Sequence, residues 1–323
     1  MAVVMPGNVE YCDATGPSRA PAWVDTRAAN AARPVAPLRI VACRLDQARV
    51  LRWSKDGNAR AGLIYGDGGG CGLDVDEGIA AVWMPLRGAL QVVTGYGDRP
   101  VHAKGAMVTE CSASVRVRGR ASGRWLVIVG DQRTWHHLLA GTAAIDRQLL
   151  PEQYVANRTL RQHAIALIRD ASGPVEREAT LRALAGLVAD LQAPLYAAIA
   201  RCPGRTYVQR RQVFVRLQRV RLFMAACCER ELDNDALARM ASYSPHHFLH
   251  TFKCVYLETP HAYLVQQRLL RARRMLSQER LAITEIALAC GFENPSAFSR
   301  LFHQHFGATA KQTRLQLQLG PGC

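Results

Sequence analysis

The chain has 323 residues, of which 49% are hydrophobic and 21% are charged, and this composition is typical of a folded soluble protein with two domains. No apolar run approaches the roughly 18 residues that a membrane helix needs. The N-terminus also lacks the basic segment followed by an apolar segment that would predict export. We therefore expect a cytoplasmic protein that does not enter a membrane. The formal net charge of +15 favours a polyanionic partner, either nucleic acid or anionic lipid.

The first 36 residues are rich in Ala, Pro and Gly without a sustained period, and they predict a disordered tail at 1–36. Residues 37–192 begin with short β-type runs separated by turn signals such as Asp67-Gly-Gly-Gly70. Ser114–Arg118 alternates strictly between polar and apolar residues, as expected for a strand with one exposed face. Many short strands at this spacing predict an antiparallel β-barrel or sandwich.

Helical periodicity follows the strands. One amphipathic helix is predicted at 157–170 and another at 175–191. These helices could pack on the β region of their own chain or mediate dimerisation, and the sequence leaves both readings open. Residues 193–210 contain two prolines and a glycine and predict a linker to a C-terminal domain at 211–316.

The ten cysteines include no Cys-x-x-Cys pair, and several lie in apolar helical patterns. In a chain without an export signal such cysteines are usually reduced and buried, and we favour this reading over disulfide bonds or zinc binding. They are Cys12, Cys43, Cys71, Cys111, Cys202, Cys227, Cys228, Cys254, Cys290 and Cys323.

The C-terminal region contains an internal repeat, with a first unit at 237–252 and a second at 286–302. In each unit a short helix ends at a small residue, where a left-handed backbone is easiest for Gly. An aromatic residue, a polar N-cap and a proline at the first helical position follow, and the second helix then has Phe at i and i+4. This pattern predicts two helix-turn-helix units, each with a second helix free to enter a major groove. The matching residues are Ser242 with Gly291, Tyr243 with Phe292, Ser244-Pro245 with Asn294-Pro295, Phe248 with Phe298, and Phe252 with Phe302.

A third start signal, Thr259-Pro260, predicts a helix that reaches about Gln278. At 1.5 Å per residue such a helix is roughly 27 Å long, so it could hold two recognition helices near the roughly 34 Å between successive major-groove faces. Residues 205–314 contain 17 Lys or Arg and 8 Asp or Glu, so the positive charge is concentrated in this third of the chain. Both observations favour DNA as the polyanionic partner.

The second unit resembles the signature of the AraC/XylS family of transcription regulators. The residues that carry the resemblance are Ala287, Gly291, Phe292, Ser296, Phe298, Ser299, Arg300, Phe302 and Gly307. The first unit also fits through Phe252-Lys253 and Thr259-Pro260, so the resemblance covers about residues 210–315. The chain departs from the family at Ser242 and Leu257, where Gly is usual, at Ala310, where Pro is common, and at Thr313, where an aromatic residue precedes Arg314.

The resemblance implies base-contacting residues early on the second helix of each unit. They are His246, Leu249 and His250 in the first unit and Ser296, Ala297 and Arg300 in the second. Arg300 is the strongest candidate, because its guanidinium can bond O6 and N7 of guanine together; an Arg bound only to phosphate or to a nearby carboxylate is the alternative. Lys253, Arg268 and Arg271 are candidate phosphate contacts, and Ser242, Gly291 and Gly307 are the structural turn residues. We expect the second unit to read bases more strictly and the first mainly to anchor the domain.

The resemblance further implies an α+β protein, with a cupin-like antiparallel β-barrel and appended helices before an all-α domain of two helix-turn-helix units. Promoter DNA, RNA polymerase, a second copy of the chain and a small effector are the expected partners, and activation is the expected outcome. We expect no enzyme activity, metal or cofactor, because His102 has no partner at ligand spacing and His136-His137 point two ways on a helix. Three alternatives stay open: a metal-dependent cupin enzyme, a cysteine-dependent DNA-repair enzyme, and a regulator whose first domain binds a protein.

Overall fold

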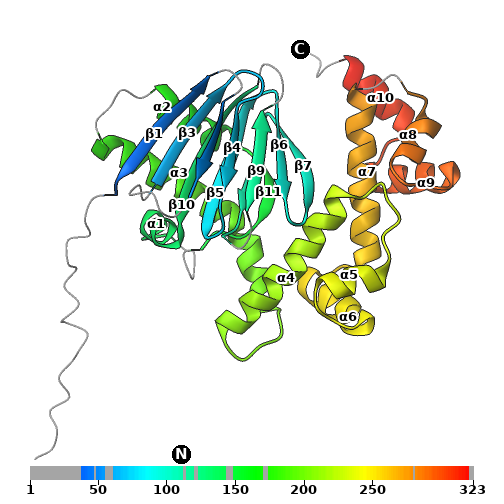
Figure 1. Cartoon of the computed structure of the whole chain (residues 1–323). Helices are drawn as coiled ribbons and strands as arrows, with labels where there is room; N and C mark the ends of the chain where they lie inside the picture. Colours follow the sequence, from blue (N-terminus) through cyan, green and yellow to red (C-terminus); the bar gives the residue numbers. More distant parts are fainter. Residues whose placement is uncertain are drawn as a thin grey trace, which may run out of the picture. The chain divides into compact units, whose positions relative to one another are not determined.

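The computed structural model describes residues 38–46, 49–54, 61–111, 114–119, 123–142, 148–169, 174–278 and 281–319. The predicted tail at 1–36, together with Cys12 and Cys323, lies outside these residues. The chain from Leu38 onward forms one compact unit. It begins with strands and ends with helices, as the sequence predicts (Figure 1).

Eleven strands of the described chain form two sheets that face each other. The first sheet has the order β1-β3-β10-β5-β8-β11 and the second has the order β2-β4-β9-β6-β7. The first contains β1 (Ile40–Asp46), β3 (Ala61–Asp67), β10 (Arg124–Asp131), β5 (Ile79–Arg87), β8 (Gly105–Thr109) and β11 (Glu152–Val155). The second contains β2 (Val50–Trp53), β4 (Gly72–Val75), β9 (Val115–Gly119), β6 (Ala89–Thr94) and β7 (Gly97–His102).

The expected antiparallel β-barrel is not closed, which leaves the sandwich that the strand pattern also predicts. The sheets keep separate edges, and the edge strands β1 and β2 pair in parallel with β3 and β4. The chain changes sheet at sharp corners, as between β3 and β4, where Gly68 and Gly70 have φ values of 109° and 78°. Only Gly adopts such angles without strain, so the strands turn into a sandwich rather than continue around a barrel.

The space between the sheets is filled by side chains of the protein itself. Trp83, Met107 and Trp125 are fully buried there, and the alternation predicted for β9 is confirmed, because Val115 and Val117 belong to the same core. The indole N–H of Trp83 donates to the Thr109 hydroxyl at 3.0 Å. Such tight filling is typical of a structural core and not of an open ligand cavity.

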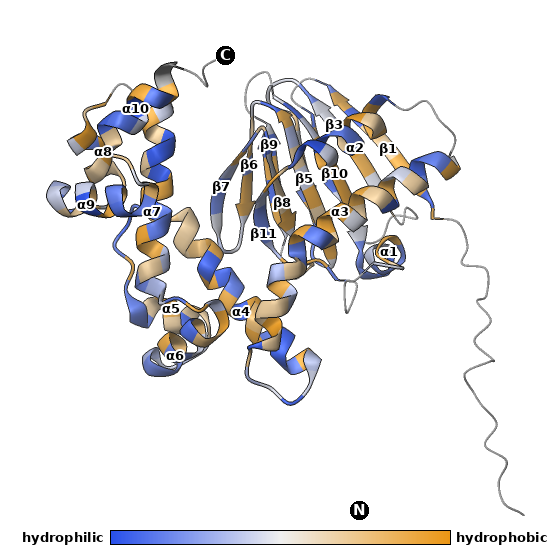
Figure 2. Ribbon diagram, turned by 180° about the vertical axis from the view of Figure 1, so that it is seen from behind, coloured by the Kyte–Doolittle hydropathy of each residue, from blue (hydrophilic) through white to orange (hydrophobic). Residues whose placement is uncertain are grey.

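Helices cover the outer face of the first sheet. They are α1 (Gln132–Leu138), α2 (Arg158–Arg169) and α3 (Pro174–Ala200), and Figure 2 shows α2 and α3 lying across the strands. In β10, Leu126 and Ile128 pack in this second core, whereas Val127 and Val129 pack between the sheets. Because both faces of β10 are buried, its sequence is a continuous apolar run rather than an alternating one.

Within the predicted linker at 193–210, α3 continues through Pro194 to Ala200 and α4 starts at Tyr207, so only 201–206 lie outside a helix. Pro194 lies on the exposed side of α3, and the residues after it are buried again, so packing keeps the helix intact. The buried amide of Gln192 anchors this segment by accepting from Leu150 N at 3.2 Å and donating to Leu150 O at 2.8 Å. By length and composition, 175–200 could also cross a membrane, although half of it is buried inside the protein.

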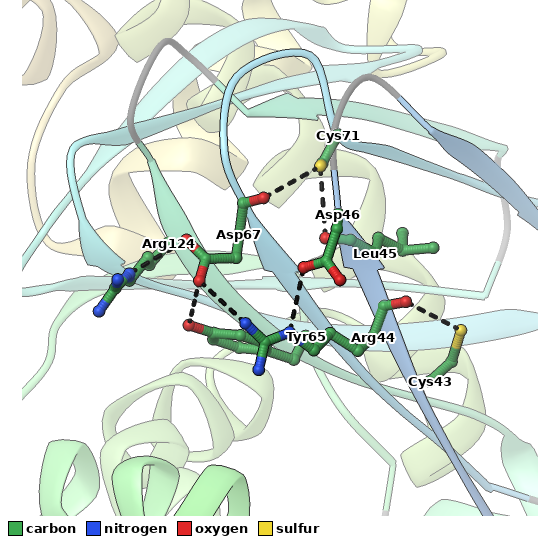
Figure 3. A network of polar contacts seen from close by, with 8 residues as sticks. All are labelled: Cys43, Arg44, Leu45, Asp46, Tyr65, Asp67, Cys71 and Arg124. Atoms are coloured by element: carbon green, nitrogen blue, oxygen red, sulfur yellow. Dashed lines mark hydrogen bonds and ion pairs between the residues drawn. The ribbon is translucent and has the colours of Figure 1, made fainter.

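A polar network joins the exposed ends of three strands in the first sheet (Figure 3). Asp67 at the end of β3 receives Arg44 from β1 at 3.3 Å, Arg124 from β10 at 3.1 Å and the Tyr65 hydroxyl at 3.3 Å. The Cys71 thiol donates to Leu45 O at 3.4 Å and so links the turn after β3 to β1. These contacts hold the parallel edge strand in register.

Seven helices complete the described chain: α4 (Tyr207–Ala226), α5 (Asn234–Met240), α6 (Pro245–Tyr256), α7 (Pro260–Gln278), α8 (Ile283–Ala289), α9 (Pro295–Phe306) and α10 (Ala310–Leu319). Helix α4 contacts the β region directly, because Leu222 packs in the core between the sheets. Two ion pairs reinforce this contact, one from Arg219 to Glu110 at 2.6 Å and one from Arg221 to Glu152 at 2.7 Å.

Candidate nucleic-acid interface

The two repeat units adopt the same backbone form. Helices α5 and α6 make the first helix-turn-helix, and α8 and α9 make the second. The residues predicted to allow the turn, Ser242 and Gly291, both have a left-handed backbone, with φ values of 59° and 85°. The predicted N-caps are also confirmed. Ser244 Oγ accepts from His247 N at 3.4 Å, and Asn294 Oδ1 accepts from Ser296 N at 2.8 Å.

Each second helix buries one face and exposes the other. Phe248 and Phe252 of α6 and Phe298 and Phe302 of α9 are all at most 1% exposed. Phe292 in the second turn packs on Phe298 with a centroid distance of 5.2 Å, as expected for an aromatic residue that fills the gap between the helices. The opposite faces of α6 and α9 are therefore free for a ligand that fits a helix.

The ends of α6 and α9 also match, although their residues differ. Leu257 and Gly307 both have a left-handed backbone, with φ values of 62° and 71°. In each case the backbone N–H donates to the carbonyl oxygen four residues back, Leu257 to Lys253 O and Gly307 to His303 O. Leu257 thus adopts the same backbone as Gly307 and carries the strain of a non-glycine residue in this conformation.

Helix α7 joins the two units, and its predicted bounds are confirmed. Thr259 Oγ1 accepts from Ala262 N at 3.1 Å and caps its start. The 19 residues of α7 give a length of roughly 28 Å. Tyr263 near its start packs in the core that contains the Phe residues of α6, and Leu276 near its end packs in the core that contains those of α9. The helix therefore spans both units as the rigid connection that the sequence predicts.

The predicted base-contacting residues lie on the free faces of α6 and α9. His246, Leu249 and His250 are exposed on α6, and Leu249 is 38% exposed despite its apolar side chain. Ser296 and Arg300 are exposed on α9, whereas Ala297 is half-buried. The fold thus brings the six residues into two groups, one on each second helix.

The three predicted phosphate contacts separate into different roles. Lys253 is exposed in the last turn of α6, where a contact with DNA is open to it. Arg268 instead bonds within the protein, because it donates to Cys228 O at 2.7 Å and to Arg230 O at 2.9 Å. Arg271 lies 3.6 Å from the carboxylate of Glu229. These two arginines fix α7 to the turn that follows α4.

Gly291 reveals a contact between the units that the sequence alone did not predict. A Cβ atom at this position would lie 2.7 Å from Glu229 O and 3.0 Å from Arg268 Nε. The turn of the second unit is therefore packed against the turn that precedes α5 of the first unit, with Arg268 between them. The glycine is needed both for its backbone angle and for this close approach.

Sequence reasoning also missed one exposed residue that the repeat identifies. The offset of 50 after the turn pairs Lys253 with His303, and His303 is exposed on the last turn of α9 as Lys253 is on α6. Arg314 has a structural role, since its guanidinium donates to Leu281 O at 2.7 Å and holds α10 to the start of the second unit.

The described residues include no group of three or more His, Cys, Asp or Glu placed to hold a metal ion. Burial raises the pKa of Cys202 to about 12 and that of Cys290 to about 11, so both thiols are protonated at neutral pH. Neither thiol is in the state that a nucleophile requires.

Two helix-turn-helix units mounted on one connecting helix define a class of DNA-binding protein. Residues 237–316 match a family described as a helix-turn-helix domain. The chain is 31% identical over 105 residues to the transcriptional regulator GbdR of Pseudomonas aeruginosa, covering 32% of this chain and 29% of GbdR. It is 39% identical over 56 residues to the transcriptional activator RhaS of Shigella boydii, covering 17% of this chain and 20% of RhaS.

A solved AraC-type transcriptional regulator from Chromobacterium violaceum is 33% identical, with coverage of 33% of this chain and 95% of that chain and a TM-score of 0.32. The chain spans less than a third of the length of the two curated relatives. The shared part is the double helix-turn-helix region, and the chain belongs to the AraC/XylS family of transcription regulators. These relatives are described as transcriptional regulators.

Proposed function

We propose that the protein activates transcription from specific promoters by placing α6 and α9 in successive major grooves, and that it acts as a homodimer that contacts RNA polymerase. The observation that carries this proposal is the pair of exposed helix faces at the two ends of α7. Helix α7 is roughly 28 Å long, and one second helix packs near each of its ends. The two second helices can therefore lie near the roughly 34 Å that separates successive major-groove faces of B-DNA.

Within this function the side chains have different roles. Arg300 would donate two hydrogen bonds to a guanine edge, which is the most common specific contact in a major groove. Ser296 and Ala297 precede it by one turn on the same helix. On α6, His246 and His250 offer donors to bases or phosphates, and Leu249 offers only an apolar contact, for example to a thymine methyl group. The second unit would therefore supply most of the sequence preference.

The test is quantitative DNA binding by the full chain to fragments of its own genomic neighbourhood. We expect log K to fall linearly with log salt concentration, and Arg300→Ala to reduce discrimination at one base step by on the order of 1–3 kcal/mol. Arg116→Ala is the matched control, because Arg116 is exposed on β9 and its loss removes the same charge outside the helical region. If the full chain retards none of these fragments at low salt, the proposed function is refuted.

A small effector sensed by the N-terminal region is part of the proposal. The core between the sheets is filled by Trp83, Trp125 and their neighbours, which argues against an effector inside the sandwich. An effector site would then lie outside the two sheets, where it could also contact the helices that read DNA.

A further inference from the structure

A pocket of about 760 Å³ lies where β11, the end of α3, α4 and α7 come together. Its volume is in the range of small-molecule sites, which is about 300–1,000 Å³. Its walls come both from the β region and from the helix that connects the two helix-turn-helix units. We call it the junction pocket.

The polar wall of the junction pocket is strongly positive. Arg99 of β7, Arg221 of α4 and Arg273 and Arg274 of α7 line it, and Glu152 is the one carboxylate among its lining residues. Glu152 is already paired with Arg221 at 2.7 Å. The remaining three arginines have no compensating carboxylate in the lining, so the pocket presents an excess of positive charge to whatever enters it.

Two of these lining arginines each have a buried nitrogen atom with no hydrogen-bond partner among the described residues. The two atoms are Arg99 Nη1 and Arg221 Nε. Desolvation lowers the pKa of Arg274, and the nearby charges of Arg271 and Arg99 lower it further. Guanidinium groups that are desolvated and crowded by other cations are stabilised when an anion binds between them.

The lining of the junction pocket also includes an apolar wall of leucines. Leu195 of α3, Leu270 of α7 and Leu317 of α10 contribute to it. Leu270 is 37% exposed and Leu317 is 40% exposed, so both have apolar surface that a ligand could cover. An inorganic ion would satisfy the arginines but leave this wall in water, whereas a neutral apolar molecule would do the reverse.

We propose that the junction pocket binds a small organic anion with an apolar body, held by Arg99, Arg221 and Arg274 against the leucine wall. This site deepens the proposed function, on which it rests, by giving the effector a chemical class and a place. The anion would compete with Glu152 for Arg221 and would touch α7, so its binding changes how the β region holds the helix that carries both reading units.

The test uses two fluorescent probes with the full chain. 8-Anilinonaphthalene-1-sulfonate carries an aromatic body and a sulfonate, and N-phenyl-1-naphthylamine has the same body without the charge. We expect saturable binding of the sulfonate to one site, at least tenfold tighter than binding of the neutral probe. Arg274→Gln and Arg99→Gln, which lie on different elements, should each weaken sulfonate binding at least tenfold and neutral-probe binding less than twofold.

Arg116→Gln is the control for loss of one charge, and circular dichroism melting shows that each variant is folded. The proposal is overturned if the two probes bind equally, if the sulfonate does not saturate, or if neither pocket variant weakens it. DNA retardation is measured separately on the same samples. Failure of the proposed function appears there as absent DNA binding, whereas failure of the pocket proposal appears as unselective probe binding by a protein that still retards DNA.

Discussion

Replacing Gly291 with Ala should loosen the packing between the two helix-turn-helix units. The φ value of 85° at this position strains any residue with a side chain, and the new Cβ would meet Glu229 O at 2.7 Å and Arg268 Nε at 3.0 Å. The carbonyl belongs to the backbone and cannot rotate away. Either Arg268 or the turn that contains Glu229 must move, and Arg268 would then lose at least one of its bonds to Cys228 O and Arg230 O.

The magnitude follows from two contributions. A non-glycine residue in the left-handed region costs roughly 1–2 kcal/mol. Loss of one hydrogen bond from a charged donor costs about 1.5–3 kcal/mol more. We therefore expect Gly291→Ala to lower the free energy of unfolding by about 3 kcal/mol, which is a large part of the stability of a typical domain.

Gly307→Ala provides the matched control. Gly307 has a similar φ value of 71°, but a Cβ there would have no atom within 4 Å, so this variant should lose only about 1 kcal/mol. Urea unfolding followed by circular dichroism at 222 nm gives both values. If Gly291→Ala is no less stable than Gly307→Ala, the close packing between the units does not hold them together and the reasoning fails.

Three further predictions rest on individual residues. Leu257→Gly should raise the free energy of unfolding by about 1 kcal/mol in urea, because it removes left-handed strain at a residue that is 72% exposed; an unchanged midpoint would contradict this. Burial raises the pKa of Glu178, but hydrogen bonds from His137, Arg182 and the Leu38 N–H outweigh this and hold it below its usual value. The stability that Glu178 contributes is therefore present above about pH 4.5 and lost as the pH falls through its lowered pKa, so Glu178→Gln should lower the Tm at pH 7 and lower it progressively less as the pH falls below 4.5. Lys253→Ala should reduce the slope of log K against log salt by about 1, while Arg268→Ala should lower stability without this change in slope; equal slopes for Lys253→Ala and the unmodified chain would remove Lys253 from the DNA contacts.

The helical C-terminal region could be predicted almost residue by residue because its signals are local. Ser244-Pro245, Asn294-Pro295 and Thr259-Pro260 each combine a capping side chain with a proline at the first helical position, and each starts a helix in the structure. The spacing of the Phe residues sets the buried face within a single helix. None of these inferences needs to know which distant segment lies nearby.

The errors concern features that depend on distant contacts. Pro194 is a reasonable helix breaker in isolation, but α3 continues because the residues beyond it are buried and Gln192 is anchored to Leu150. Arg268 is one of several arginines on an exposed-looking helix, and only the fold shows that the carbonyls of Cys228 and Arg230 receive it. The parallel pairing of β1 with β3 likewise has no local signature.

We expect the second unit to read bases more strictly than the first, and the structure gives this difference a new physical basis. Ser242 and Leu257 adopt the backbone of Gly291 and Gly307, so the missing glycines do not distort the first unit. The difference lies in what each unit packs against. The first unit is built into the rest of the protein, because Phe248 and Val255 share a core with α3 and α4 and Arg201 donates to Val255 O at 2.8 Å.

The second unit has a separate core, which contains Phe298, Phe302 and the far half of α7. Besides α7 itself, the contact of Gly291 with Arg268 and Glu229 links it to the first unit. A ligand in the junction pocket touches α7 and would therefore shift the second unit relative to the first more readily than it would shift the first relative to the β region. If the second unit carries most of the sequence preference, this arrangement would let an effector act on the unit that discriminates between promoters while the other unit keeps the protein on DNA.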